Sequence, residues 1–298
     1  MHRIMVQKKE DKIKNIAFFY FYIISLALLG NGCKDKDAEA VFNKPTDYHY
    51  LVVGKQLYEE EGCLRAKDEP LNYRITVSIN DNPICSINEP TGIFAINHYI
   101  KSGENRVKIC TEGLQSIEAA VTATSDFMSQ SVKGHVQYDP QESSSLECEF
   151  TFLANINYTL PIYRPENYFI ADEQEKKANV LKLIKSVLDA FDRGKMEKAA
   201  SILFEGSQLY SPCAFGISSK DTRDAVEAHG MKNPIFSGSG SIQYQKFEPE
   251  KYAIKYGKNI ILVYRKDGKN VFYKSILSET PTTVAYIDGK YIVWFALN

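Results

Sequence analysis

The chain has 298 residues and a net charge of −1, and its 24% charged and 44% hydrophobic residues are typical of a globular protein. A net charge this close to zero predicts no basic surface for a phosphate backbone, so we expect no nucleic-acid partner. The length is enough for one large domain or two medium ones after a short leader.

The N-terminal segment predicts export. Arg3 and four lysines precede an apolar run over residues 16–30, and Cys33 follows shortly after. A run of about 15 residues suits a signal peptide, whereas a membrane-spanning helix needs about 20. The charged stretch that starts at Lys34 ends the run abruptly, which argues against a buried core helix.

This leader resembles a bacterial lipoprotein signal peptide, in which a Leu, two small residues and a Cys form the lipobox and the Cys carries the lipid. The chain departs from that pattern, because Leu29 lies one position too far back and Asn31 is larger than usual. The resemblance implies a signal peptide at 1–32, lipidation at Cys33, and a polar tether at 33–47.

Two alternatives to the lipoprotein interpretation remain open. One is ordinary cleavage after Ala40, and the other is an uncleaved short anchor. All three place the body of the protein outside the cytoplasm. We therefore expect a cell-envelope protein, anchored to the inner or outer membrane by its lipid and facing the periplasm, or a secreted one.

Residues 48–165 show mostly a period of two, which predicts short strands with one buried face. Polar turns separate these strands, and such a pattern is typical of an antiparallel β-sandwich. The expected strands are 49–53, 73–79, 84–87, 106–109, 117–124 and 146–152.

Three segments of this half, INDNPI at 79–84, FAINHYI at 94–100 and SGENRV at 102–107, resemble the galactose-binding-like jelly-roll domains. The resemblance implies a β-sandwich and says little about a ligand, because these positions build the fold. Gly103 suits a turn with positive φ, and the Asn105 side chain can bond back to that turn. Asp81 and Asn82 stand where the family usually has Gly.

Residues 171–298 change to a helical period and then return to strands. We expect helices at 173–193, 196–204 and 222–229, with Gly194 and Gly230 ending the first and third. Helices followed by an antiparallel meander make the whole chain α+β, with a β-sandwich first and a curved antiparallel sheet last. The expected strands are 242–247, 252–256, 260–266, 271–277, 282–287 and 291–297, with hairpin turns at Asp267-Gly268 and Asp288-Gly289.

The helix ending LDAFDRG at 188–194 and the hairpin YIDGKYIVWF at 286–295 resemble the nuclear-transport-factor-like, cystatin-type cone. That family includes enzymes, binding modules and dimerisation domains. Its pocket acids and histidines match no motif of this chain, so the resemblance implies no site residue.

The last sheet is apolar on both faces at 260–263 and 291–297. One apolar face is enough to cover the sheet's own helices, so the second face must meet the sandwich, a second copy or a protein partner. We expect packing within the chain, with a homodimer as the alternative. Amphipathic aromatic residues suit a contact surface, here Tyr264, Tyr273, Tyr286 and Trp294.

No motif predicts catalysis, a cofactor or a metal. The five histidines show no metal-binding spacing, and we expect His98 in a turn or on the surface. Glu59, Glu60 and Glu61 are expected at a solvated helix end or loop. The cysteines other than Cys33 can form up to two disulfides or stay free, with Cys85–Cys110 as one candidate pair; they are Cys63, Cys85, Cys110, Cys148 and Cys213.

These observations predict an exported lipoprotein with a non-catalytic binding or protein-interaction role. One alternative is a small-ligand-binding protein or enzyme that uses the concave C-terminal sheet, with Arg265 among its polar contacts. The other is an inhibitor or immunity-type protein of the envelope.

Overall fold

The structure is a computed structural model that describes residues 47–87, 91–125, 130–139, 146–169, 171–215, 244–274 and 282–296. All described residues belong to one compact unit, Asn43–Asn298. Cys33, the expected third helix at 222–229 and most of the tether lie outside the described residues. In the described part, no helix has both the length and the apolar character needed to cross a membrane.

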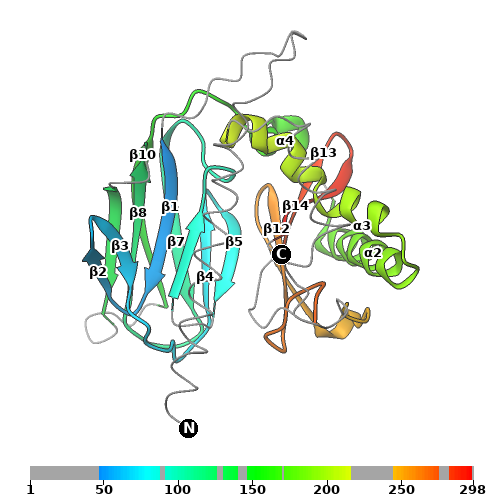
Figure 1. The fold of residues 1–298 in the computed structure, drawn as a ribbon, viewed down its shortest axis with the longest axis horizontal. Helices are drawn as coiled ribbons and strands as arrows, with labels where there is room; N and C mark the ends of the chain where they lie inside the picture. The colour runs from blue at the N-terminus through cyan, green and yellow to red at the C-terminus, as the bar shows by residue number, and fades with distance from the viewer. Residues whose placement is uncertain are drawn as a thin grey trace. The chain divides into compact units, whose positions relative to one another are not determined.

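The first half is a β-sandwich of two antiparallel sheets (Figure 1). One sheet has the order β6-β1-β8-β9 and the other has the order β10-β7-β4-β5. The strands of the first sheet are β1 (Tyr48–Gly54), β6 (Thr91–Ala95), β8 (Ile117–Thr124) and β9 (Ser131–Tyr138). Those of the second are β4 (Ile75–Ile79), β5 (Asn82–Ile87), β7 (Gly103–Thr111) and β10 (Glu147–Ala154).

The predicted alternation of apolar and polar residues places one face of each strand in the sandwich core. Inward-facing residues such as Leu51, Val77 and Ile109 are at most 1% exposed, and they belong to one apolar cluster between the sheets. The sequence analysis missed β6, β9 and the hairpin of β2 (Leu57–Glu60) and β3 (Cys63–Ala66). Glu59 and Glu60 therefore lie on an exposed strand, whereas they were expected at a helix end or in a loop. The hairpin of β2 and β3 covers Val52 on the outer face of the sheet that contains β1.

The turn before β7 forms as its residues predicted. Gly103 has φ +86°, a conformation that glycine adopts without strain. The buried Asn105 side chain accepts a hydrogen bond from the Lys101 N–H at 2.9 Å and donates one to the Lys101 carbonyl at 2.8 Å. It also accepts from the Asn80 amide, which joins this turn to the turn between β4 and β5.

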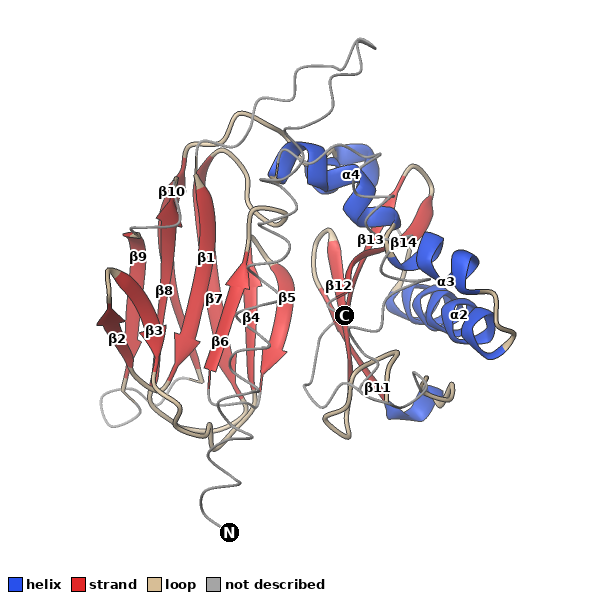
Figure 2. Ribbon diagram, in the orientation of Figure 1, coloured by secondary structure: helices blue, strands red, loops and turns tan. Residues whose placement is uncertain are grey.

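Among the described residues, three α-helices follow the sandwich: α2 (Glu173–Asp192), α3 (Met196–Leu203) and α4 (Glu205–Ala214) (Figure 2). Asp172 caps α2 by accepting a hydrogen bond from the Glu175 N–H at 2.8 Å. Gly194, with φ +67°, ends it. The sequence analysis did not predict α4, which contains Pro212.

The chain ends in a four-stranded antiparallel sheet with the order β11-β12-β13-β14. Its strands are β11 (Tyr252–Tyr256), β12 (Ile260–Arg265), β13 (Thr282–Ile287) and β14 (Lys290–Ala296). The turn between β13 and β14 has positive φ at Asp288 and Gly289, as a two-residue hairpin requires. A bulge interrupts the ladder between Thr283 and Val284. The fold is thus α+β, as the sequence predicted.

Both faces of this sheet are buried within the chain. Ile261, Val263 and Val284 pack with the apolar face of α2. The alternate residues on the other face, including Ile260 and Trp294, belong to the same apolar cluster as the sandwich core. The second apolar face therefore meets the β-sandwich, which is the expected packing within the chain.

Candidate functional site

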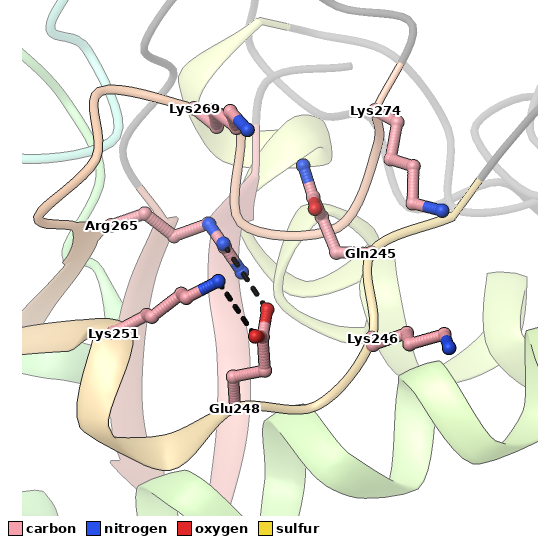
Figure 3. A pocket seen from close by; sticks show the side chains of 7 residues that line it. All are labelled: Gln245, Lys246, Glu248, Lys251, Arg265, Lys269 and Lys274. Carbon is pink, nitrogen blue, oxygen red and sulfur yellow. Dashed lines mark ion pairs between the residues drawn. The ribbon is translucent and has the colours of Figure 1, made fainter.

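A hollow of about 270 Å³ lies beside β11 and the end of β12 (Figure 3). Five of the side chains that line it carry a positive charge, and one is a carboxylate. The lining residues are Gln245, Lys246, Glu248, Lys251, Arg265, Lys269 and Lys274. We call this feature the Arg265 pocket.

Short backbone links hold the segments of the Arg265 pocket together. The Gln245 N–H donates to the Phe272 carbonyl at 2.8 Å, and the Gln245 amide donates to the Tyr273 carbonyl at 3.1 Å. The buried Asn270 side chain accepts from the backbone N–H groups of Phe272 and Tyr273 at 2.9 and 3.0 Å. These hydrogen bonds therefore hold the segment that contains Lys246 next to the segment that contains Lys274.

Arg265 is the most deeply buried cation of the pocket lining, with only 1% of its side chain exposed. Its Nε and Nη2 donate to the two carboxylate oxygens of Asp267 at 2.9 and 2.7 Å, a bidentate pair that fixes the guanidinium plane. Nη2 also lies 3.6 Å from Glu248 Oε2. Within the described residues, Arg265 Nη1 and the neighbouring Tyr252 hydroxyl are both buried without a hydrogen-bond partner.

The charges of the pocket do not balance. Hydrogen bonding to Arg265 lowers the pKa of Asp267, and hydrogen bonding to Lys251, at 2.6 Å, lowers the pKa of Glu248. Both carboxylates are therefore ionised at neutral pH and are engaged by these two cations. In the described part of the chain Lys246, Lys269 and Lys274 have no ion pair, so the lining is left with a positive excess that attracts anions.

A second hollow, of about 470 Å³, lies beside β2 in the sandwich. Its lining is mixed in charge, with Lys55, Glu69 and Glu118. Glu118 is already engaged, because its carboxylate accepts from the Leu57 N–H at 2.7 Å and lies 2.9 Å from His135 Nε2. Lys55 and Glu69 are of opposite sign, so this lining has no positive excess like that of the Arg265 pocket.

The five described cysteines are all thiols. Cys85 lies in β5 and Cys110 in β7, on opposite sides of β4 and on opposite faces of the sheet. Two strands separated by a third lie about 9.5 Å apart, beyond the reach of a disulfide, so the expected Cys85–Cys110 pair is wrong. Burial raises the pKa of Cys85, Cys110, Cys148 and Cys213, the value for Cys148 being about 11. Cys63 lies half-buried in β3.

The four aromatic residues expected at a contact surface lie at different places. Trp294 is completely buried, and its indole donates to the His98 carbonyl at 3.1 Å. Tyr264 is 8% exposed, with the Arg74 guanidinium 4.8 Å above its ring. Tyr273 packs against Phe191 of α2, and Tyr286 packs against Tyr291 of β14. The structure does not bring these four together.

His98 lies in the turn after β6, as expected, but it is completely buried rather than exposed. Tyr210 stacks on its ring with centroids 4.9 Å apart, and Phe295 lies 4.4 Å away. Neither ring nitrogen has a partner among the described residues. Burial lowers the pKa of His98 to about 3, so the ring is neutral at physiological pH.

No described group of three or more His, Cys, Asp or Glu side chains could hold a metal ion. The sequence analysis had named Arg265 as a polar contact of the last sheet but had not found the pocket. The lysines of the pocket come from several separate segments, and no sequence spacing connects these segments.

The comparisons with known proteins found no match among the protein-family models, the curated proteins or the solved structures.

Proposed function

We propose that this chain is an exported, envelope-anchored binding protein that holds an anionic group in the Arg265 pocket and does not transform it. The carrying observation is the buried, carboxylate-fixed Arg265 in the lining of a hollow whose Lys246, Lys269 and Lys274 have no ion pair among the described residues. A cation whose position is already fixed costs little ordering on binding, which favours recognition.

The candidate nucleophiles support a non-catalytic role. A cysteine nucleophile must be a thiolate, and burial favours the protonated thiol at Cys85, Cys148 and Cys213. His98 lies in a closed aromatic cluster. Neither the described cysteines nor His98 line the Arg265 pocket, so an enzyme acting there would have to use the lysines, Arg265 and the ion-paired Glu248.

The leader supports the envelope location. On this proposal residues 1–32 are removed, Cys33 carries the lipid, and the tether lets the described body face the periplasm. The two-layer strand arrangement is compatible with a galactose-binding-like sandwich, and the helices and last sheet with a cystatin-type cone. Both are scaffolds that can carry a binding site without chemistry.

Mass spectrometry of the mature N-terminus tests the anchor. The full chain is expressed in a bacterium with a lipoprotein-processing pathway, alongside the variant Cys33→Ser. We expect a diacylglyceryl-modified Cys33 as the first residue, with recovery in the membrane fraction, and loss of both in the variant. A mature chain that starts at Val41 would overturn the anchor.

A fluorescence binding titration tests the binding role separately. The mature full chain, purified in a neutral detergent, is titrated with a fluorescent polyanion, and the salt dependence of binding is measured. We expect the binding to weaken as the salt concentration rises. We also expect the double variant Lys246→Ala with Lys274→Ala to bind more weakly than wild type. Equal binding by wild type and the double variant would overturn the role of the pocket.

A further inference from the structure

We infer that the Arg265 pocket is built for a tetrahedral oxyanion of two or more charges, with a phosphoryl group as the biological form, rather than for a carboxylate. This inference rests on the proposed function and specifies its ligand class.

The charge excess favours a multiply charged ligand. Lys251 is matched by Glu248 and Arg265 by Asp267, which leaves Lys246, Lys269 and Lys274 unmatched among the described lining residues. A carboxylate would neutralise one of these three charges. A phosphate monoester carries close to two negative charges at neutral pH and would neutralise more of the excess.

The donor geometry favours acceptors that point in several directions. Figure 3 shows Arg265, Lys251 and Lys269 on one side of the hollow and Lys246 and Lys274 on the other. A lysine ammonium is a point charge with three donors and imposes no planar geometry. The bidentate edge of Arg265 that best fits a carboxylate is already occupied by Asp267. A planar carboxylate would therefore reach fewer of these donors than a tetrahedral oxyanion.

Arg265 has a buried polar neighbour on the adjacent strand, Tyr252 of β11, which pairs with it in the sheet. Arg265 Nη1 and the Tyr252 hydroxyl have no hydrogen-bond partner in the described part of the chain. The Arg265 guanidinium carbon lies 5.7 Å from the centre of the Tyr252 ring. Buried polar groups are usually satisfied, so an unpaired Arg265 Nη1 on a residue that lines a cationic hollow indicates a donor whose hydrogen bond is completed by a ligand or by water.

The size indicates more than a bare phosphate. One water occupies about 30 Å³ in the liquid, so a hollow of about 270 Å³ holds several atoms beyond a phosphate. The phosphoryl group could belong to a soluble phosphate monoester or to a membrane lipid whose headgroup is a phosphate monoester. Both sources present the same chemistry, and the test separates them.

The test measures binding by isothermal titration calorimetry at fixed ionic strength. The mature full chain in a neutral detergent is titrated with pyrophosphate, inorganic phosphate and malonate, a dicarboxylate control. We expect pyrophosphate to bind at least tenfold more tightly than malonate. Equal affinities would overturn the phosphoryl preference while leaving the proposed anion binding intact, and no binding of any anion would overturn both.

Paired lysine variants locate the binding. Lys246→Ala with Lys274→Ala removes two exposed pocket lysines, and we expect at least a tenfold loss of pyrophosphate affinity. The control, Lys101→Ala with Lys133→Ala, removes the same charge from exposed positions of the sandwich and should keep the affinity within twofold. An equal loss in both variants would show general charge attraction and would overturn the site.

Vesicle flotation identifies the source of the phosphoryl group. The mature full chain with Cys33→Ser, which lacks a lipid anchor, is mixed with vesicles that contain phosphatidic acid, a phosphate monoester, or with phosphatidylcholine vesicles. Binding to phosphatidic acid that the pocket variant abolishes supports a lipid headgroup. Pyrophosphate binding without flotation supports a soluble phosphorylated compound, and flotation that the pocket variant does not reduce overturns the lipid source.

Discussion

The indole N–H of Trp294 in β14 donates a hydrogen bond to the backbone carbonyl of His98, 196 positions earlier in the chain. The N···O distance is 3.1 Å, and both residues are fully buried. This bond links the last strand of the molecule to the turn between β6 and β7. It is one of several contacts that fuse the sandwich and the last sheet into one compact unit.

Replacing Trp294 by Phe tests that link. The substitution keeps an aromatic ring but leaves the buried His98 carbonyl without its donor, at a cost of about 1–3 kcal/mol in the free energy of unfolding. Trp294 is the single tryptophan of the chain, so the variant has no tryptophan fluorescence with which to follow unfolding. Unfolding in urea is therefore followed by far-UV circular dichroism. Tyr286→Phe, at a half-exposed position of β13, serves as the control. Equal stability of Trp294→Phe and wild type would contradict the prediction.

His98 predicts a pH dependence of stability. Its pKa is about 3 in the folded state and 6.5 in the unfolded chain, because burial penalises the charged ring. Between these values the unfolded state binds a proton that the folded state does not, so stability falls as the pH falls below 6.5. The limiting slope is about 1.4 kcal/mol per pH unit, and the loss ends near pH 3.

The variant His98→Leu isolates this effect, because a leucine side chain does not titrate. We expect the difference in unfolding free energy between wild type and variant to change by about 2 kcal/mol from pH 7.5 to pH 5. The change should favour the variant at the lower pH. Parallel stability curves for the two proteins would show that His98 is accessible to protons in the folded state.

Asn82 joins the sandwich to the last sheet. Its Oδ1 accepts hydrogen bonds from the backbone N–H groups of Asn259 and Ile260, at 2.6 and 3.0 Å. Asn82→Ala would leave two buried donors unpaired, at a cost of about 2–4 kcal/mol. Urea unfolding measures that loss, and limited proteolysis should show faster cleavage near 257–260. Ser201→Ala on the exposed face of α3 is the control and should change stability by less than about 0.5 kcal/mol.

At Gly206, helix propensity and packing have opposite effects on the stability of an alanine variant. Alanine is favoured over glycine by about 1 kcal/mol in a helix interior. A Cβ at Gly206 would lie 2.5 Å from the Trp294 backbone oxygen, an atom held by the sheet. We therefore expect Gly206→Ala to destabilise the protein by about 1–3 kcal/mol in thermal unfolding. Stabilisation would mean that α4 can move away from β14.

The thiols give a chemical readout of burial. Cys85 in β5 is 1% exposed, and desolvation raises the pKa of its thiol. In the native protein at pH 8 we expect Cys85 to resist a thiol reagent for hours and to react at once in urea, because the thiolate is the reactive form. Mass spectrometry of the alkylated peptides identifies the site. Rapid native labelling at Cys85 would contradict its burial.

Local residue patterns determined much of this protein. A period of two predicted β1, β4, β7, β8 and β10, and apolar spacing with Gly194 predicted α2 and its end. These elements form because each buries one face of its own, and that face is visible in neighbouring residues. The strands β2 and β9 were missed because they lie largely exposed and lack a clean apolar alternation.

The tertiary structure decided what the second apolar face of the last sheet meets, where His98 lies, and which lysines share a pocket. Each of these depends on segments far apart in the chain, such as Asn82 beside Asn259, or Lys246 beside Lys274. Hydrophobic burial requires that an apolar face be covered but does not name its partner, because the effect has no direction. Directional hydrogen bonds from residues such as Trp294 and Asn82 select one arrangement among the apolar ones, and they exist only after the chain has folded.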